Sequence, residues 1–192
     1  MTRSLTSTVA YATVVAMLLA LVAVGPVAAG TYSRDVAAEK YAHKLLNCTR
    51  TGGWVNKHGK CLAYGSGKFS AKRPALRLHK NISLKVAWPW ARTMAAKQVC
   101  AHALPGKPKL AQRMRSKGFK YWTYGENVGC LWGGNDAKAV VLMVHRMMQA
   151  EKSSKGGHWK NMKNPAYKSV GIGVAKGNGR ITVVWDFYGK KY

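Results

Sequence analysis

Four polar side chains have the types needed for chemistry and stand where the sequence predicts buried faces or tight turns: His102, Glu126, Glu151 and His158. Neutral imidazoles bind zinc or copper, and carboxylates orient such histidines or join them as ligands. The same groups could hold a water molecule and activate it for hydrolysis, with Glu126 or Glu151 as the base. No His-Glu-x-x-His or Gly-x-Ser-x-Gly motif is present. A structural interpretation therefore stays open, in which the four side chains pair and tie helices to a sheet.

The stretch 150–162 carries two of these four residues. Glu151 ends an apolar helical pattern, a Ser-Ser-Lys-Gly-Gly turn follows, and His158 comes directly before Trp159. The chain has six acidic residues against 32 basic ones, so a carboxylate at such a position indicates a specific role.

Two helices are expected in the first half of the chain. Ser33 can cap a helix over residues 34–47. Pro89 fits the first position of a second helix over 89–102. In that helix one stripe follows the i, i+3, i+4, i+7 rule, which predicts that His102 points where the apolar residues point: Ala91, Met94, Ala95, Val99 and His102.

The clearest helix spans residues 136–151, capped by Asn135 or Asp136. Its expected apolar stripe puts Glu151 on the buried face at the helix end, together with Val140, Val144 and Met147. Before this helix, residues 119–130 are rich in aromatics and read Gly-Glu-Asn-Val-Gly-Cys at their end. They predict an extended segment, with Glu126 in it, that leads into a tight turn at glycine.

The end of the chain has the pattern of a β-hairpin. Residues 169–176 alternate apolar and small side chains, a Lys-Gly-Asn-Gly turn follows, and residues 181–188 form an apolar strand. Helices, a strand, a helix and then a hairpin predict an α+β fold, with an antiparallel sheet covered by helices. No linker, repeat or low-complexity tract interrupts residues 30–192, which we interpret as one domain.

The N-terminus has the features of a secretory signal peptide. Arg3 supplies a positive charge, residues 13–25 form a short apolar run, and Val-Ala-Ala at 27–29 offers small residues for cleavage. We expect cleavage after Ala29, a secreted domain over 30–192, and no transmembrane segment in the mature chain. An uncleaved membrane anchor is the alternative.

Export makes disulfides plausible for the four cysteines: Cys48, Cys61, Cys100 and Cys130. Three pairings are possible, and the neighbouring pairs, Cys48–Cys61 and Cys100–Cys130, close the shortest loops. Free thiols or a zinc cluster are the alternatives, although no Cys-x-x-Cys spacing appears. A Cys100–Cys130 bridge would hold the segments of His102 and Glu126 together.

The formal charge of the chain is +26, and removal of Arg3 with the signal segment would leave 31 basic and six acidic residues, or +25. Such a surface attracts polyanions. Outside a cell these are acidic envelope polymers, anionic lipid headgroups or free nucleic acid, and no feature indicates a specific nucleic-acid partner. An adaptation to external conditions with no partner is equally open.

A set of short motifs resembles a known family in order and spacing. These are Pro-Trp-Ala at 89–91, Cys-Ala-His at 100–102, Gly-Glu-Asn at 125–127, Gln-Ala-Glu at 149–151, Gly-His-Trp at 157–159 and Val-Gly-Ile-Gly-Val at 170–174. From residue 33 to 189 the chain resembles the CAP superfamily (cysteine-rich secretory proteins, antigen 5 and pathogenesis-related proteins), in its secreted bacterial branch.

The resemblance implies an α-β-α sandwich with a central cleft that holds two histidines and two glutamates, here His102, Glu126, Glu151 and His158. In some members the histidines bind a divalent metal such as zinc, which would make His102 and His158 the metal ligands. Sterol or lipid binding and proteolysis are known or proposed in parts of the family. Gly-His continues here with Trp159, Lys160 and Asn161 in place of the eukaryotic Tyr-Thr-Gln, and the second cysteine-containing signature is absent.

Three functions follow as hypotheses. The first is a secreted, non-catalytic binding domain whose cationic surface holds an envelope polyanion and whose His/Glu cleft holds a divalent metal or small ligand. The second is a metal-dependent hydrolase with peptidase-like chemistry in the same cleft. The third is a membrane-active cationic protein. The sequence leaves the question of catalysis open.

Overall fold

The computed structural model describes residues 31–64, 70–119 and 122–190. The expected signal peptide, residues 1–29, lies outside these residues and stays a prediction. The helical segments are α1 (Val36–Arg50), α2 (Lys80–Ile82), η1 (Ser83–Ala87, a π-helical turn), α3 (Trp88–Lys97), α4 (Leu110–Ser116), α5 (Ala137–Ala150) and α6 (Gly157–Lys163). The strands are β1 (Ser33–Arg34), β2 (Trp54–Val55), β3 (Cys61–Leu62), β4 (Arg77–Leu78), β5 (Trp122–Trp132), β6 (Ser169–Gly177) and β7 (Arg180–Lys190).

One sheet forms the middle layer, with the strand order β1-β6-β7-β5. All of these neighbours are antiparallel, while the short β4 pairs with β6 in parallel. The expected β6–β7 hairpin is present, and Asn178 and Gly179 at its tip both have positive φ, as a two-residue type I′ turn requires. Strands β2 and β3 form a separate small hairpin.

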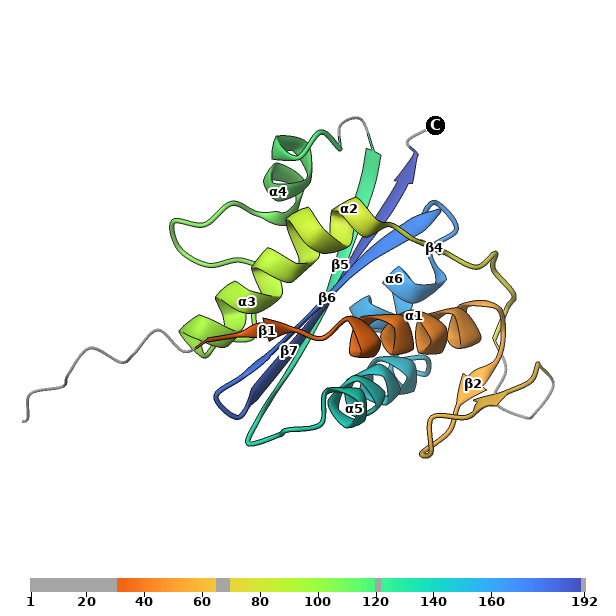
Figure 1. The fold of residues 1–192 in the computed structure, drawn as a ribbon. Helices are drawn as coiled ribbons and strands as arrows, with labels where there is room; N and C mark the ends of the chain where they lie inside the picture. Colours follow the sequence, from red (N-terminus) through yellow and green to blue (C-terminus); the bar gives the residue numbers. More distant parts are fainter. Residues whose placement is uncertain (1–30, 65–69, 120–121, 191–192) are drawn as a thin grey trace, which may run out of the picture.

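Helices cover both faces of the sheet (Figure 1). On one face, α1, α5 and α6 bury a large core with inward residues of β6 and β7 such as Val174 and Trp185. On the other face, α3 packs its Ala91, Met94 and Ala95 against Val184 of β7. This arrangement confirms the α+β class and the α-β-α sandwich. None of the helices in the described part of the chain is long and apolar enough to cross a bilayer.

The helix boundaries differ from the expectation at two places that matter for the cleft. Helix α1 starts at Val36, because the side chain of Asp35, not Ser33, accepts the hydrogen bond of Ala38 N at 2.8 Å. Helix α3 ends at Lys97, because Gln98 adopts the left-handed conformation with φ 56°. His102 therefore lies in an irregular segment, and the prediction that it shares the helical stripe of α3 was wrong.

Helix α5 has the expected start, with Asp136 accepting bonds from Lys138 N and Ala139 N. Its buried stripe runs through Val140, Val144 and Met148, whereas Met147 is 64% exposed. The placement of Met147 on the buried face was therefore wrong.

Both predicted disulfides are present. Cys48–Cys61 joins α1 to the β2–β3 hairpin, with 5.8 Å between the Cα atoms. Cys100–Cys130 joins the segment after α3 to β5, with 5.9 Å between the Cα atoms. The second bridge ties the His102 segment to the strand that carries Glu126.

Candidate functional site

The four polar residues that the sequence singled out line one open cleft of about 400 Å³. They come from four places: the loop after α3 (His102), β5 (Glu126), the residue after α5 (Glu151) and the first turn of α6 (His158). The remaining lining residues are small or polar: Ser154, Gly156, Gly157 and Asn161. The sandwich thus brings together side chains that are up to 56 positions apart, His102 and His158.

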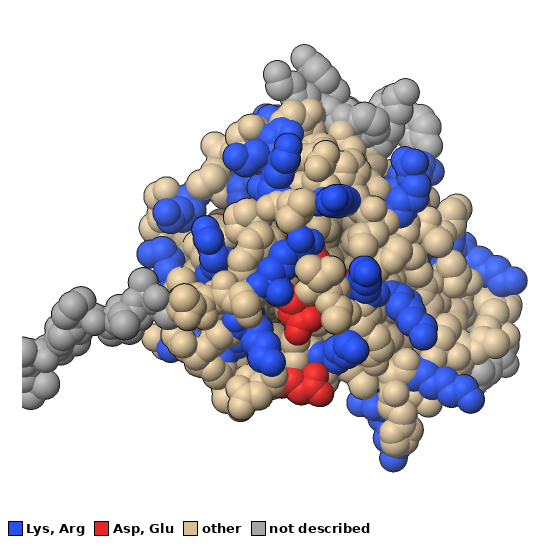
Figure 2. All heavy atoms as spheres, in the orientation of Figure 1, with Lys and Arg blue, Asp and Glu red and all other residues tan. Residues whose placement is uncertain are grey.

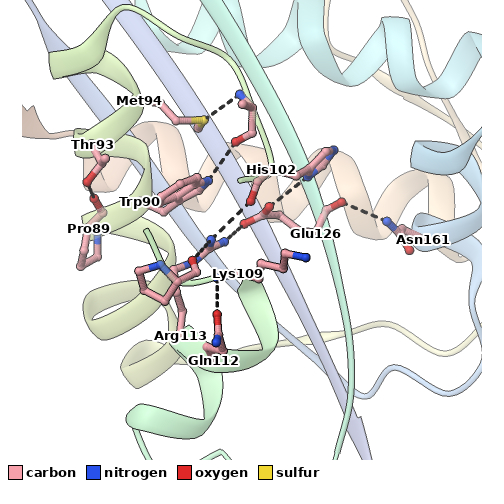
Figure 3. Close-up of polar contacts among 12 residues, drawn as sticks. Pro89, Trp90, Thr93, Met94, His102, Lys109, Gln112, Arg113, Glu126 and Asn161 are labelled. Carbon is pink, nitrogen blue, oxygen red and sulfur yellow. Dashed lines mark hydrogen bonds and ion pairs between the residues drawn. The ribbon is translucent and has the colours of Figure 1, made fainter. Parts of the chain in front are cut away.

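The first pair is His102 with Glu126, which Arg113 completes. Nδ1 of His102 lies 2.9 Å from Oε1 of Glu126, and Nη2 of Arg113 bonds the other carboxylate oxygen. The Arg113 guanidinium lies over the Trp90 ring, 4.1 Å from its centroid, and donates to the carbonyl of Pro108 at 3.2 Å. In Figure 3, His102 and Arg113 both reach the Glu126 carboxylate. Arg113 therefore balances the charge of this nearly buried glutamate.

The second pair is His158 with Glu151. Nδ1 of His158 lies 2.6 Å from Oε1 of Glu151, while Oε2 accepts the backbone N–H of His158 at 3.0 Å. A side chain at Gly156 would place its Cβ 2.4 Å from Oε2 of Glu151, so the turn needs glycine there. The flexible turn expected at 153–157 is thus a close fit around the carboxylate, and His158 sits in a helix that the sequence pattern did not predict.

The two pairs differ in how the protein shifts their pKa values. The hydrogen bond to Glu126 raises the pKa of His102 above 6.5, against the opposing effect of burial. Burial alone would raise the pKa of Glu151, but the hydrogen bond and charge of His158, with two backbone N–H groups, outweigh burial and lower the pKa.

Both imidazoles present the same edge to the cleft. An ionised carboxylate only accepts hydrogen bonds, so each Nδ1 carries the hydrogen and each Nε2 keeps a free lone pair. The two ring centroids lie 6.4 Å apart, with 32° between the ring planes. Among the described residues no group of three or more His, Cys, Asp or Glu side chains is arranged to hold a metal. A metal ion in this cleft would have the two oriented imidazoles as its protein ligands, fewer than a closed structural zinc site has.

Two asparagines connect the pairs across the cleft floor. Asn161 Nδ2 donates to the carbonyl of Glu126 at 3.1 Å and to Oδ1 of Asn127 at 2.9 Å. Asn127 Nδ2 donates in turn to the carbonyl of His158 at 3.1 Å. Figure 3 shows Asn161 reaching the main chain of Glu126 from the α6 side. Asn127 and Asn161 thus hold α6 at a fixed place on β5, and sequence reasoning gave them no role.

Asp186 is a further acid beside the cleft that sequence reasoning missed. It stands directly opposite Glu126 in the β5–β7 ladder, and it is fully buried. Among the described residues, neither of its carboxylate oxygens has a hydrogen-bond partner of normal geometry. Burial, and then the neighbouring charge of Glu126, raise the pKa of Asp186 well above 3.8. The aspartate in the apolar run Val-Val-Trp-Asp-Phe was the available signal.

Two glycines bring α5 and the segment after α6 close to β5. A Cβ on Gly125 would lie 2.2 Å from Oη of Tyr167, and a Cβ on Gly129 would lie 2.2 Å from a methyl group of Val144 in α5. Both glycines belong to the strand, so the tight turn expected at this glycine-rich stretch was wrong.

A family model described as CAP, the cysteine-rich secretory protein family, matches residues 70–187. The fold is similar to an extracellular protein with an SCP domain from Bacillus anthracis, at 18% identity and a TM-score of 0.55, over 81% of this chain but 41% of that one. An outer surface protein from Borrelia burgdorferi has 16% identity and a TM-score of 0.59, over 84% of this chain and 99% of that one. A structure described as NaASP2 with Zn²⁺ has 17% identity, 80% coverage of both chains and a TM-score of 0.50. Among curated proteins no sequence matches.

Proposed function

The chain belongs to the cysteine-rich secretory protein (CAP) family, and from the geometry of its cleft we propose an extracellular binding protein that holds a divalent metal ion or a small ligand between His102 and His158. The observation that carries this proposal is the shared arrangement of the two imidazoles. Each Nδ1 is bonded to a carboxylate at 2.9 Å or less. This is the contact that orients metal-binding histidines and raises their basicity.

Binding accounts for the cleft better than hydrolysis does. Glu126 is occupied by His102 and Arg113, and Glu151 is occupied by His158 and two backbone N–H groups. A general base needs a carboxylate oxygen that can reach a water molecule and take its proton. Since both carboxylates accept several hydrogen bonds already, we assign them to orienting the histidines. A bound ion would supply Lewis acidity to whatever ligand enters the cleft.

An extracellular location agrees with the rest of the molecule. Two disulfides persist in oxidising compartments and are rare in the cytosol. The similar folds from Bacillus anthracis and Borrelia burgdorferi are described as an extracellular protein and an outer surface protein. We therefore propose that this chain acts outside the cell, after cleavage of the predicted signal peptide.

The surface charge supports attachment to an anionic envelope polymer or lipid surface. Figure 2 shows Lys and Arg side chains spread over the visible face, with few acidic atoms among them. Six carboxylates cannot balance 32 basic side chains, so counter-ions must come from outside the molecule. Attachment of this kind weakens as salt screens the charges.

Metal titration of the purified mature protein tests the cleft. At pH 7.5 we expect calorimetry with Zn²⁺ to detect binding that drops about tenfold or more in His102→Ala and in His158→Ala. His58→Ala, an exposed histidine outside the cleft, serves as the control. A proton competes with Zn²⁺ for the imidazole of His102, and the pKa of this histidine is raised above 6.5. When the pH is lowered from 7.5, Zn²⁺ binding should therefore start to weaken before pH 6.5 is reached. Equal Zn²⁺ affinity in wild type and both cleft variants would contradict the proposal.

A further inference from the structure

A second cavity, of about 470 Å³, opens beside the C-terminal half of α3. It shares no lining residue with the His/Glu cleft. Its charged lining side chains are all cations: Arg92 and Lys97 from α3, and Lys107 from the loop that leads to α4. The rest of the wall consists of three residues with hydroxyl groups and one alanine: Thr31, Tyr32, Thr93 and Ala96. In Figure 2, Lys and Arg side chains also gather on the left side of the molecule, where Figure 1 places α3 and the loop to α4.

Two contacts hold polar groups of this pocket in place. The Arg92 guanidinium lies over the Trp88 ring, 5.8 Å from its centroid. The Tyr32 hydroxyl accepts a hydrogen bond from Nη1 of Arg180 at 2.9 Å. Since that bond uses the oxygen as the acceptor, the hydroxyl hydrogen can still be donated to a ligand. Arg180, behind Tyr32, adds a fourth positive charge to this end of the molecule.

The negative end of the α3 dipole is partly offset at this pocket. Two of the last four carbonyls of the helix accept hydrogen bonds: Met94 O accepts Val99 N at 3.1 Å, and Ala95 O accepts Gln98 N at 3.3 Å. Nη1 of Arg180 also donates to Ala95 O, at 3.4 Å. A cation in the last turn, Lys97, offsets the remaining dipole charge.

We propose that this pocket binds a phosphate group of an anionic polymer or lipid headgroup. The inference rests on the proposed attachment to the envelope and gives that attachment a place on the protein. A guanidinium fork and two ammonium groups are the side chains that recognise phosphate oxygens, and a neutral hydroxyl donor adds direction. A hollow lined by one sign of charge concentrates the electrostatic potential more than the same cations would on a convex surface.

The concave shape of this pocket distinguishes it from other cationic parts of the surface. With 32 basic residues in the chain, a mere cluster of cations would indicate nothing. Here three cations and Tyr32 line one cavity. The proposal therefore predicts an effect of position that net charge alone does not produce.

Two triple variants with the same net charge test the position. Arg92→Gln/Lys97→Gln/Lys107→Gln empties the pocket of its lining cations. Lys40→Gln/Lys44→Gln/Arg146→Gln removes three exposed cations from α1 and α5, in the opposite layer. Each full-length variant goes from +26 to +23. Binding of a short linear polyphosphate, followed by fluorescence anisotropy across a salt series, should weaken about tenfold or more in the pocket variant and less than about threefold in the control.

A milder variant checks the hydroxyl. Tyr32→Phe keeps all cations and should weaken polyphosphate binding by about fivefold, the value of one neutral hydrogen bond. Polyglutamate of equal charge should bind less tightly than polyphosphate and respond equally to both triple variants. Phosphatidylglycerol vesicles form the second arm: loss of vesicle binding only in the pocket variant identifies a lipid headgroup as the source of the phosphate. Unchanged vesicle binding together with lost polyphosphate binding identifies a soluble polymer.

The outcomes separate this inference from the proposed function. If the two triple variants lose polyphosphate binding equally, the pocket proposal is wrong, while attachment through general charge stands. If wild type binds neither polyphosphate nor vesicles at low salt, the pocket and the envelope attachment both fail, and only the Zn²⁺ titration of the cleft remains as support for the proposed function. Both variants should stay folded, because all six side chains are exposed and the Arg92–Trp88 contact and the Lys97 dipole effect are each worth only about 1 kcal/mol or less.

Discussion

The two histidine–glutamate pairs of the cleft look alike in their contacts but are built differently. His102 and Glu126 are 24 residues apart, and their side chains are 56% and 3% exposed. His158 and Glu151 are seven residues apart, and their side chains are 33% and 29% exposed. The first pair depends on a buried carboxylate that the whole sandwich positions, whereas one turn of chain builds the second. Changes around Glu126 should therefore affect folding, and changes around Glu151 should mainly affect the cleft.

The largest difference is expected when the charge balance of each pair is broken. Arg113→Met leaves the Glu126 carboxylate buried without its cation, which should lower the free energy of unfolding by about 3–5 kcal/mol. Glu151→Gln, in the partly exposed pair, should cost about 1 kcal/mol or less. Urea unfolding measures both, with Arg115→Met on the exposed side of α4 as the control. Similar costs for Arg113→Met and Glu151→Gln would remove the distinction between the pairs.

Removing each disulfide in turn should affect the free energy of unfolding in both cases, but the geometry of the cleft in only one. Loss of either bridge, by Cys100→Ser/Cys130→Ser or Cys48→Ser/Cys61→Ser, should cost about 3–4 kcal/mol from loop closure. Of the two bridges, Cys100–Cys130 is the one that ties the His102 segment to β5, beside the hydrogen bond between His102 and Glu126. We therefore expect Zn²⁺ affinity to fall about tenfold without this bridge and to stay near wild type without the other. Calorimetry on the folded fraction checks this, and an equal loss in both variants would show that the bridge has no particular role at the cleft.

The effects of pH are small per pH unit, and the two acids Asp186 and Glu151 should respond with opposite sign. The pKa of Asp186 is raised in the folded protein. At a pH above its ordinary pKa of 3.8, the aspartate therefore takes up a proton when the chain folds. Stability should then fall by about 1.4 kcal/mol per pH unit while folded Asp186 stays protonated. The pKa of Glu151 is lowered, so its contribution is present above the ordinary 4.5 and is lost as pH falls through the folded value.

Unfolding curves between pH 3 and pH 8 measure these two contributions. Asp186→Asn should flatten the decline toward higher pH, and Glu151→Gln should reduce the loss toward lower pH. An unchanged pH profile in Asp186→Asn would mean that Asp186 is not held protonated in the folded protein.

Local patterns were enough to predict the elements that depend on neighbouring residues. Helix α5 follows from its Asp136 cap and apolar spacing, and the β6–β7 hairpin follows from the Asn-Gly turn between two apolar runs. The four cleft residues were singled out by their types and expected positions, and the motif order led to the CAP family, which implies the same four. The chosen cysteine pairing also matches the structure.

The errors arise where distant contacts decide. Helix α3 stops at Gln98 because the chain turns back toward the Cys100 bridge, which the apolar spacing of residues 91–102 could not reveal. Arg113 gave no signal, because one arginine among 32 basic residues is not distinctive. Its role appears only when β5 places Glu126 beside α4. The seven-residue helix α6 was missed, because its Gly-His-Trp start follows a glycine turn that is unfavourable for helix on propensity alone.

The close approach at Gly125 and Gly129 limits how this protein could change its ligand during evolution. No larger residue fits at either position while Tyr167 and Val144 keep their places, so β5, and with it Glu126, cannot move to a new distance from α5. Variation in ligand size would have to come from loop residues that line the cleft, such as the exposed Ser154, where a change disturbs the sandwich least.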